Sequence, residues 1–202
     1  MNADTRNRIV MTAMELFWEK GFQSTSIADI LSRSQVHSGS LYHFFPGKQD
    51  VLAAVLEAYR DGIEEWLLKP AWSGVDDAIE RVFALIDGYR LQLVTTDCTY
   101  GCPIGSLALE LHEPDPRIRD LLSANFINWT LAIERCLDEA GDRLPAALDR
   151  RRLAEFTLTV LEGALMQART YRDVASFDRN IAVLREHVDM LLEQARSERA
   201  SA

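Results

Sequence analysis

Apolar residues recur at helical spacing along almost the entire chain. Ile9, Ala13, Leu16 and Phe17 lie at i, i+4, i+7 and i+8, which predicts a first helix that ends at Gly21. The same periodicity predicts further helices over residues 27–33, 38–44, 48–69, 75–94, 103–111, 117–140, 146–171 and 176–195. No segment alternates between apolar and polar residues as a strand would. The pattern therefore predicts an all-α protein of about nine helices.

The first three helices form a group that differs from the others in length and spacing. Helices as short as those over 27–33 and 38–44 are not stable alone, so we expect the first helix to pack against them. Their shared core would consist of Ile27, Ile30, Leu31, Val36, Leu41 and Phe45. The sequence thus predicts two domains, a three-helix head over residues 1–47 and a larger helical body over residues 48–202.

Composition and charge narrow the class of protein. The chain has 202 residues, 48% of them hydrophobic, and no apolar run approaches the roughly 20 residues of a membrane span. An N-terminus without an apolar segment and an odd count of three cysteines favour a cytoplasmic protein without disulfides or a membrane partner. The net charge is −9, but residues 1–48 hold five basic and four acidic side chains. The head is therefore nearly neutral and the acidity lies in the body.

The outward face of the third helix carries groups suited to DNA. With Leu41 turned inward, the helix would present Ser38, Ser40, Tyr42 and His43 to solvent. Hydroxyl and imidazole groups can hydrogen-bond base edges and phosphates in a major groove. A hairpin buried in a helical bundle would not present these side chains together, so we predict a helix-turn-helix.

The head also contains a dense family motif. It comprises Ala13, Leu16, Phe17, Gly21-Phe22, Thr25-Ser26-Ile27-Ala28-Asp29-Ile30, Gly39-Ser40-Leu41-Tyr42-His43-Phe44-Phe45-Pro46-Gly47-Lys48 and Asp50-Val51-Leu52. In these positions residues 9–56 resemble the DNA-binding head of the tetracycline-repressor (TetR) family of bacterial regulators. The sequence departs from the family at Gln35, where glycine is common, and at Ser38, where lysine is frequent.

The resemblance implies specific roles for residues of the head. Tyr42 and Lys48 would hold phosphates, Ser38, Ser40 and His43 would approach bases, and Thr25 and Ser26 would cap the second helix against the backbone. The full set of DNA-binding candidates is Thr25, Ser26, His37, Ser38, Gly39, Ser40, Tyr42, His43 and Lys48.

A single short recognition helix reads only a few base pairs, so we expect a homodimer on a palindromic operator of double-stranded DNA. The resemblance implies that the last two long helices form a four-helix bundle with their symmetry mates. The candidate interface residues are Phe156, Val160, Gly163, Ala164, Leu184, Val188 and Leu191. The same positions could also pack within one subunit.

Bulky apolar residues in the body are candidates for the wall of a small-molecule pocket. They are Phe83, Ile86, Tyr89, Cys102, Leu107, Phe126, Trp129, Ile133 and Met166. Tyr89 and Trp129 are the first choices, since each adds a hydrogen-bonding group to an apolar ring. The alternative for each residue is ordinary core packing.

One short segment of the body offers thiol chemistry. Cys102 precedes Pro103 near a predicted helix start, where the helix dipole would lower a thiol pKa. A thiolate there could react with electrophiles, and Cys98 could resolve an oxidised Cys102 into a disulfide. The run from Gly101 to Gly105 is similar to one in the electrophile-sensing branch of the family. A buried cysteine that packs beside the helix start is the alternative.

Together these patterns predict a ligand-responsive transcriptional repressor that a small molecule releases from its operator. The alternatives are a ligand-independent DNA-binding regulator and, with less support, an enzyme that uses the helical body. We expect no enzyme, because hydrolase, metalloprotease and phosphate-loop motifs are missing from the sequence. We expect no metal or cofactor either, since Glu110, His112, Glu113 and Asp115 are more typical of a solvated loop.

Overall fold

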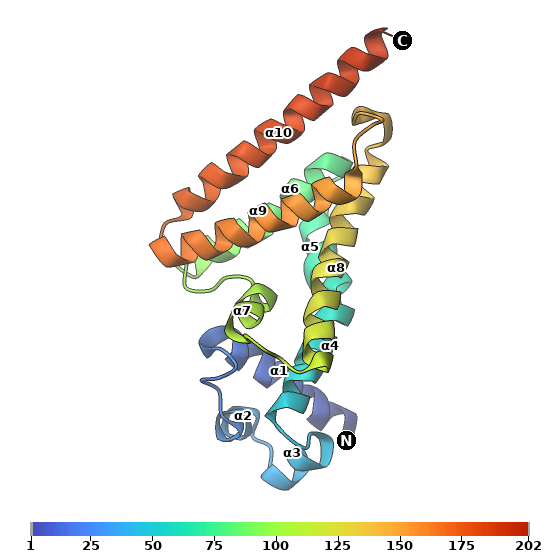
Figure 1. Ribbon diagram of the computed structural model, residues 1–202. Helices are drawn as coiled ribbons and strands as arrows, with labels where there is room; N and C mark the ends of the chain where they lie inside the picture. Colours follow the sequence, from blue (N-terminus) through green and yellow to red (C-terminus); the bar gives the residue numbers. More distant parts are fainter. Residues whose placement is uncertain (1, 202) are drawn as a thin grey trace. The chain divides into compact units, whose positions relative to one another are not determined.

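The computed structural model describes residues 2–201, with side chains from residue 4 onward, and every regular element in this range is helical (Figure 1). The elements are α1 Asn2–Lys20, α2 Ile27–Ser34, α3 Ser38–Phe44, α4 Lys48–Ile63, η1 Glu64–Leu68, α5 Lys69–Trp72, α6 Ala78–Thr95, α7 Pro103–Glu110, α8 Pro116–Glu139, η2 Gly141–Arg143, α9 Arg150–Tyr171 and α10 Val174–Ser201. Because α4, η1 and α5 follow one another without a break, residues 2–201 contain nine separate helices besides the short 3-10 turn η2. The all-α prediction is confirmed.

Three predicted helix boundaries were wrong. The helix after Lys48 does not end before Pro70, because the π-helical turn η1 changes the hydrogen-bond register and places Pro70 in the first turn of α5. Helix α9 begins four residues later than predicted, since Asp149 caps it by accepting a hydrogen bond from the Arg152 amide. Helix α10 continues to Ser201, six residues beyond the predicted end at Ala195.

The chain forms two compact units. Unit 1 comprises Met1–Ile63 and Pro103–Phe126, and unit 2 comprises Glu64–Cys102 and Ile127–Ala202. This division differs from the predicted boundary after residue 47. Helix α1 packs against α4 and α7 as well as α2 and α3, and the run Val51–Leu56 of α4 is buried. A three-helix head alone would leave these apolar faces in water.

Unit 1 is built around the buried side of α1. The fully buried residues of this core include Ile9, Ala13, Leu41, Leu52 and Leu56, which come from α1, α3 and α4. Asn125 of α8 donates one hydrogen bond to the Leu56 carbonyl, at 3.1 Å, and thereby ties α8 to α4. Unit 1 therefore joins residues that are 69 positions apart in sequence.

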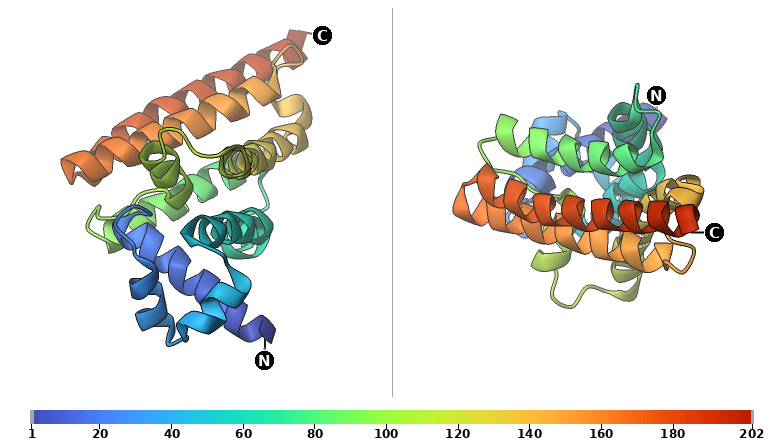
Figure 2. Two further views of the ribbon diagram at one scale, coloured as in Figure 1. Left: turned by 60° about the horizontal axis from the view of Figure 1, so that its bottom comes forward. Right: turned by 90° about the horizontal axis from the view of Figure 1, so that it is seen from above.

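Unit 2 contains α6, α9 and α10 together with the second half of α8. Helices α9 and α10 lie side by side and antiparallel, and both contact α6 (Figures 1 and 2). Their shared core includes Ile79, Ile86, Leu161, Leu165 and Phe177, all nearly inaccessible to solvent. None of the helices in residues 2–201 is both long and apolar enough to span a membrane.

Candidate nucleic-acid interface and effector site

Helices α2 and α3 form a helix-turn-helix around a left-handed turn residue. Gln35 ends α2 with φ +53° and ψ +40°, and its amide donates a hydrogen bond to the Leu31 carbonyl. This is the conformation that glycine adopts without steric cost. The presence of Gln35 where the family commonly has glycine therefore preserves the turn, but it places a non-glycine residue in a strained conformation.

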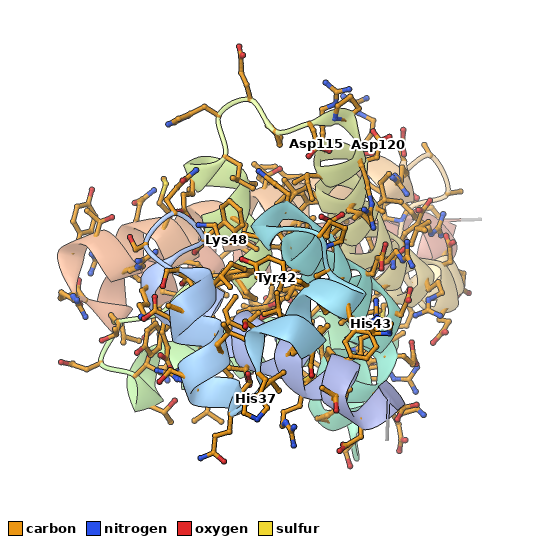
Figure 3. All side chains as sticks on the ribbon, turned by 90° about the horizontal axis from the view of Figure 1, so that it is seen from below. His37, Tyr42, His43, Lys48, Asp115 and Asp120 are labelled. Atoms are coloured by element: carbon orange, nitrogen blue, oxygen red, sulfur yellow. The ribbon has the colours of Figure 1, made fainter. Side chains whose placement is uncertain are left out.

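Helix α3 has one buried side and one exposed side. Leu41 is completely buried, whereas the neighbouring Tyr42 exposes 54% of its surface. His37, Ser38, Gly39 and His43 are also exposed, and Ser40 is half-buried. Figure 3 looks onto this face and shows His37, Tyr42 and His43 on it. Six of the nine DNA-binding candidates thus lie together on or beside one short helix.

Thr25 does not belong to this surface. Its side chain is completely buried, and its hydroxyl donates to the carbonyls of Gly21, at 2.7 Å, and Leu16, at 3.3 Å. A contact with DNA would require the end of α1 to open. The implied DNA contact is therefore wrong, and Thr25 instead closes the loop between α1 and α2.

Ser26 is exposed but serves mainly as the cap of α2. Its hydroxyl accepts a hydrogen bond from the Asp29 amide, and the Asp29 carboxylate accepts bonds from the Ser26 amide and hydroxyl. These bonds, with a contribution from Lys20, lower the pKa of Asp29 to about 2. This reciprocal capping box sets where α2 begins.

Lys48 holds the loop between α1 and α2. Its ammonium donates to the carbonyls of Phe22, at 2.8 Å, and Thr25, at 2.9 Å, and lies 4.3 Å from the centre of the Phe22 ring. The sequence indicated a phosphate ligand and did not reveal this internal role. The interaction joins the start of α4 to the loop before α2.

Two further cations of the head take part in ion pairs. Arg33 lies 2.7 Å from Glu19, and Lys20 lies 3.3 Å from Asp29. These pairs reduce the positive charge that the head offers to DNA. The evidence for a nucleic-acid surface therefore rests more on the hydrogen-bonding groups of α3 than on the net charge of the head.

The candidate pocket residues divide between the two units. Unit 2 contains Phe83, Ile86, Tyr89, Cys102, Trp129 and Ile133, and all six are buried. Leu107 is buried and Phe126 half-buried, and both belong to unit 1. Met166 is half exposed on α9, so it cannot line the interior of its own subunit. Its apolar side chain belongs to an outer face of α9, which sequence periodicity alone did not distinguish from the core.

An aromatic pair lies at the centre of the candidate set in unit 2. The rings of Tyr89 and Trp129 have centroids 5.5 Å apart and are inclined by 57°. Phe83 packs under the guanidinium of Arg185, which lies 3.3 Å from the ring centre and also pairs with Glu80. These contacts bring polar and cationic groups to the aromatic residues of α6 and α8.

Cys98 and Cys102 are both buried. The thiol of Cys102 hydrogen-bonds the carboxyl group of Glu162. Burial, together with the charge of Asp97, raises the pKa of Cys98. The sequence did not indicate this role for Glu162, whose own pKa is raised by burial and whose Oε1 atom has no hydrogen-bond partner.

The predicted dimer residues lie in two different environments. Ala164, Leu184 and Val188 are buried within the chain, so their assignment to an intersubunit surface is wrong. Phe156 is half exposed, and Val160, Gly163 and Leu191 are partly accessible.

We define the outer face of the α9–α10 hairpin as Phe156, Val160, Gly163, Met166, Val183, His187, Met190 and Leu191. Val183 and Met190 expose more than 60% of their surface, and the Phe156 and His187 rings, 6.3 Å apart, join the two helices.

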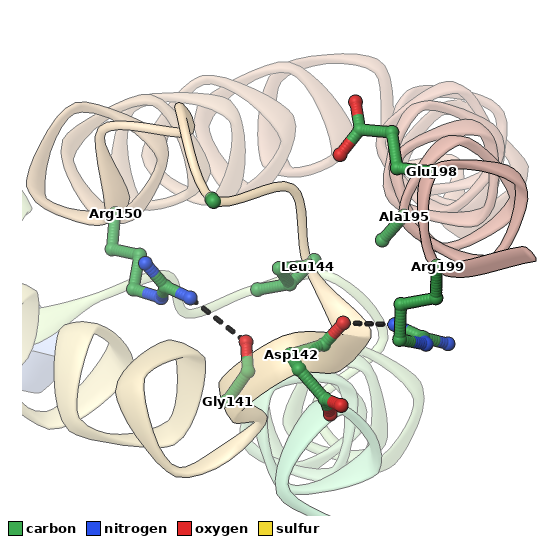
Figure 4. Close-up of a pocket in the computed structure, with 8 residues that line it drawn as sticks. Gly141, Asp142, Leu144, Arg150, Ala195, Glu198 and Arg199 are labelled. Atoms are coloured by element: carbon green, nitrogen blue, oxygen red, sulfur yellow. Dashed lines mark hydrogen bonds between the residues drawn. The ribbon is translucent and has the colours of Figure 1, made fainter. Parts of the chain in front are cut away.

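Two open cavities flank the start of α9. One, of about 460 Å³, is lined by residues that include Leu148, Phe156 and His187, and it adjoins the outer face of the hairpin. The other, of about 500 Å³, lies between the 141–146 segment and the end of α10 (Figure 4). There Arg150 and Arg199 donate to the carbonyls of Gly141 and Asp142. Both cavities open to solvent, so neither is an enclosed effector site.

Glu110, His112, Glu113 and Asp115 do not form a metal-binding cluster. Within residues 2–201 no three carboxylate, imidazole or thiol groups are arranged to hold a metal ion. Glu110 instead accepts hydrogen bonds from backbone amides of the head. Local sequence patterns could not indicate this contact, because its partners are 87 and 88 residues away.

Known protein families match both the N-terminal head and the helical body of this chain. Residues 9–55 match the family "Bacterial regulatory proteins, tetR family", and residues 78–183 match "Transcriptional regulator LmrA/YxaF-like, C-terminal domain". An uncharacterised HTH-type transcriptional regulator of Mycobacterium tuberculosis (strain CDC 1551 / Oshkosh) is 34% identical over 180 residues, which cover 86% of this chain and 88% of the relative. The HTH-type transcriptional repressor DhaR of Mycobacterium sp. (strain GP1) is 24% identical over 185 residues, 90% of each chain.

A solved structure shows the same fold. The regulatory protein TetR from Rhodobacter sphaeroides superimposes with a TM-score of 0.80 at 24% identity, covering 90% of this chain and 97% of that one. These similarities are to transcriptional regulators, which points away from an enzyme. On the matched head, the matched body and the shared fold, this chain belongs to the TetR family of DNA-binding transcriptional regulators.

Proposed function

We propose that the protein is a homodimeric repressor that binds a palindromic operator through α3 and leaves it when a small molecule occupies unit 2. The observation that carries the DNA-binding part is the division of α3 into a buried Leu41 side and an exposed polar side. In this arrangement His37, Ser38, Gly39, Ser40 and His43 approach base edges, and the Tyr42 hydroxyl bonds a phosphate. As a regulator of bacterial DNA, it would act in the cytoplasm.

The dimer in this proposal forms through the outer face of the α9–α10 hairpin. Five large apolar side chains on these helices each expose at least half of their surface: Phe156, Met166, Tyr171, Val183 and Met190. An exposed apolar area of this kind on two long antiparallel helices is typical of an association surface. Two-fold pairing would repeat α3 in the orientation that a palindrome requires.

The effector in this proposal is an apolar molecule with an aromatic or hydrogen-bonding group. Tyr89 and Trp129 offer rings for stacking together with a hydroxyl and an indole N–H. Their burial favours a ligand that enters by local opening of unit 2. A repressor role is supported by the similarity to DhaR, itself a repressor.

In vitro selection tests the proposal directly. The purified full-length protein is mixed with random duplex DNA, and bound duplexes are sequenced over several rounds. We expect enrichment of a palindrome whose half-sites are centred about 10 base pairs apart, or a multiple of that distance. Enrichment of a single unrepeated half-site would contradict the dimer, and no enrichment would contradict the operator.

Effector release is tested with the selected duplex. A library of aromatic and aliphatic small molecules is screened for loss of DNA binding by fluorescence anisotropy. An active compound should weaken DNA binding by about 5- to 150-fold, and DNA should weaken its binding by the same factor. Equal compound affinity with and without DNA would contradict release by differential binding.

A further inference from the structure

The loop between α1 and α2 is built around a carboxylate from α7. Glu110 Oε2 accepts a hydrogen bond from the Phe22 amide at 2.8 Å, and Oε1 accepts one from the Gln23 amide at 2.6 Å. Each carboxylate oxygen thus binds one backbone N–H of the head. These amides lie just beyond the end of α1, where no helical partner remains for them.

Gly21 leaves the space that this carboxylate occupies. A Cβ atom on Gly21 would lie 2.9 Å from Glu110 Oε2 and 3.1 Å from Oε1, so the carboxylate could not keep its present position. Gly21 also has φ +84°, a conformation that favours glycine. The same residue therefore ends α1 and admits the side chain of Glu110.

Lys48 binds the carbonyl groups of the same loop. Its ammonium donates hydrogen bonds to the carbonyls of Phe22 and Thr25, while the Glu110 carboxylate accepts them from the amides of Phe22 and Gln23. The loop leads directly into Ser26, the cap of α2. Its position therefore sets where the helix-turn-helix begins, and both of its anchors are side chains from other helices.

Helix α7 connects this loop to the segment that precedes it in unit 2. Glu110 is the last residue of α7, and the first, Pro103, follows Cys102 of unit 2 directly along the chain. One end of an eight-residue helix is thus covalently joined to unit 2, while the other binds the head. A displacement of α7 along its axis would carry the carboxylate and the two amides with it.

We propose that Glu110 is the positioning residue through which α7 and the DNA-reading helices act on each other. The inference rests on the proposed function, because it assigns the regulatory step of that function to one contact. Thermodynamic linkage is reciprocal. If a change in α7 alters the affinity of the head for DNA, then DNA binding must alter the free energy of that change in α7 by the same amount. This reciprocity allows a test that needs no effector.

The test measures hydrogen exchange of the α7 amides in the full-length protein, with and without saturating amounts of the duplex that the wild-type protein selects. In the wild type we expect DNA to slow exchange in residues 104–111 by about fivefold or more. In Glu110→Gln, which keeps only one acceptor oxygen, DNA should still protect α3 but no longer protect α7. Glu110→Asp, which keeps the charge but withdraws the oxygens, should give an intermediate response.

Glu113→Gln is the matched control, since it removes the same charge three residues later from an exposed loop position. It should respond to DNA like the wild type. A wild-type α7 that does not respond to DNA, or a Glu110→Gln protein that responds fully, would overturn the inference. A wild-type protein that selects no duplex would contradict the proposed function instead, so the two failures are distinguishable. A merely structural role for Glu110 would lower stability in both states without removing the DNA-dependent difference.

Discussion

Ser26 and Asp29 exchange hydrogen bonds in both directions across the first turn of α2, with the Asp29 carboxylate 2.8 Å from the Ser26 amide. The backbone and hydroxyl bonds from Ser26 lower the pKa of Asp29 to about 2. A lowered carboxyl pKa contributes stability above the unfolded value and loses it as the pH falls through the folded value. This capping box leads to the first prediction.

We expect Ser26→Ala to reduce the free energy of unfolding by about 1 kcal/mol at pH 7, because α2 loses its N-cap. Asp29→Asn should also destabilise at pH 7, and its effect should disappear as the pH is lowered from about 4 to about 2. Urea unfolding across this pH range measures both. Asp189→Asn, at an exposed position of α10, is the control and should show no such pH dependence.

Gln35→Gly should stabilise the head. The residue has φ +53°, and glycine removes a steric cost of about 1–2 kcal/mol while adding some chain entropy to the unfolded state. We expect a net gain of about 0.5–1 kcal/mol in chemical denaturation. Gln35→Ala keeps the Cβ atom and should bring no gain. A stabilising alanine variant would show that the side chain, not the backbone conformation, is unfavourable.

Tyr42 should contribute to DNA affinity without contributing to sequence preference. Its exposed hydroxyl is assigned to a phosphate, so Tyr42→Phe should weaken binding about tenfold for every duplex tested. Ser40→Ala should instead change the preference at one base position. Mobility-shift assays with the selected duplex and with single-base variants of it separate the two effects. If neither variant changes binding, α3 does not dock as proposed.

Met166→Glu should convert the proposed dimer to a monomer. The side chain lies on the outer face of the α9–α10 hairpin, where a buried charge would cost several kcal/mol. Sedimentation velocity should show the loss of the dimer at micromolar concentration. Leu109→Glu, at a more exposed apolar position on α7, should leave the dimer intact. A Met166→Glu dimer would exclude this face as the interface.

Glu162 should make unit 2 less stable as its carboxyl group ionises. Burial raises its pKa above the ordinary value, so the folded state binds the proton more tightly than the unfolded state does. Stability attributable to this residue should therefore fall as the pH rises above 4.5. Glu162→Gln should be more stable than the wild type at pH 7, and the difference should shrink toward pH 4. Thermal unfolding over this range tests it, with the exposed Glu186→Gln as control.

Local features of the sequence predicted most of the helices and the chemistry of the head. The Gly21 helix end follows from the backbone preferences of a few neighbouring residues, whereas Gln35 adopts its left-handed turn against the preference of a non-glycine residue. The prediction of a helix end before Pro70 failed because a π-turn upstream changed the register. Such a turn has no clear signal in the spacing of apolar residues.

The side on which a helix meets its neighbours could not be predicted in the same way. Ala164 and Met166 both fit an apolar stripe on α9, yet one is buried and the other half exposed. Thr25 and Lys48 fit a DNA-binding motif, yet both bond to backbone groups of the head. Periodicity assigns a residue to a stripe but does not say which helix, if any, will cover it.

By itself, then, the sequence determined the helical class and the helix-turn-helix, because caps, turns and periodicity act over one or two helical turns, and the residues of its motif carried the resemblance to the family. Only the tertiary structure decided the roles of Glu110, Lys48 and Glu162. Each of these charged groups acts on residues at least 23 positions away in sequence. The free energy of such contacts depends on burial and on geometry, and both arise only when distant helices pack together.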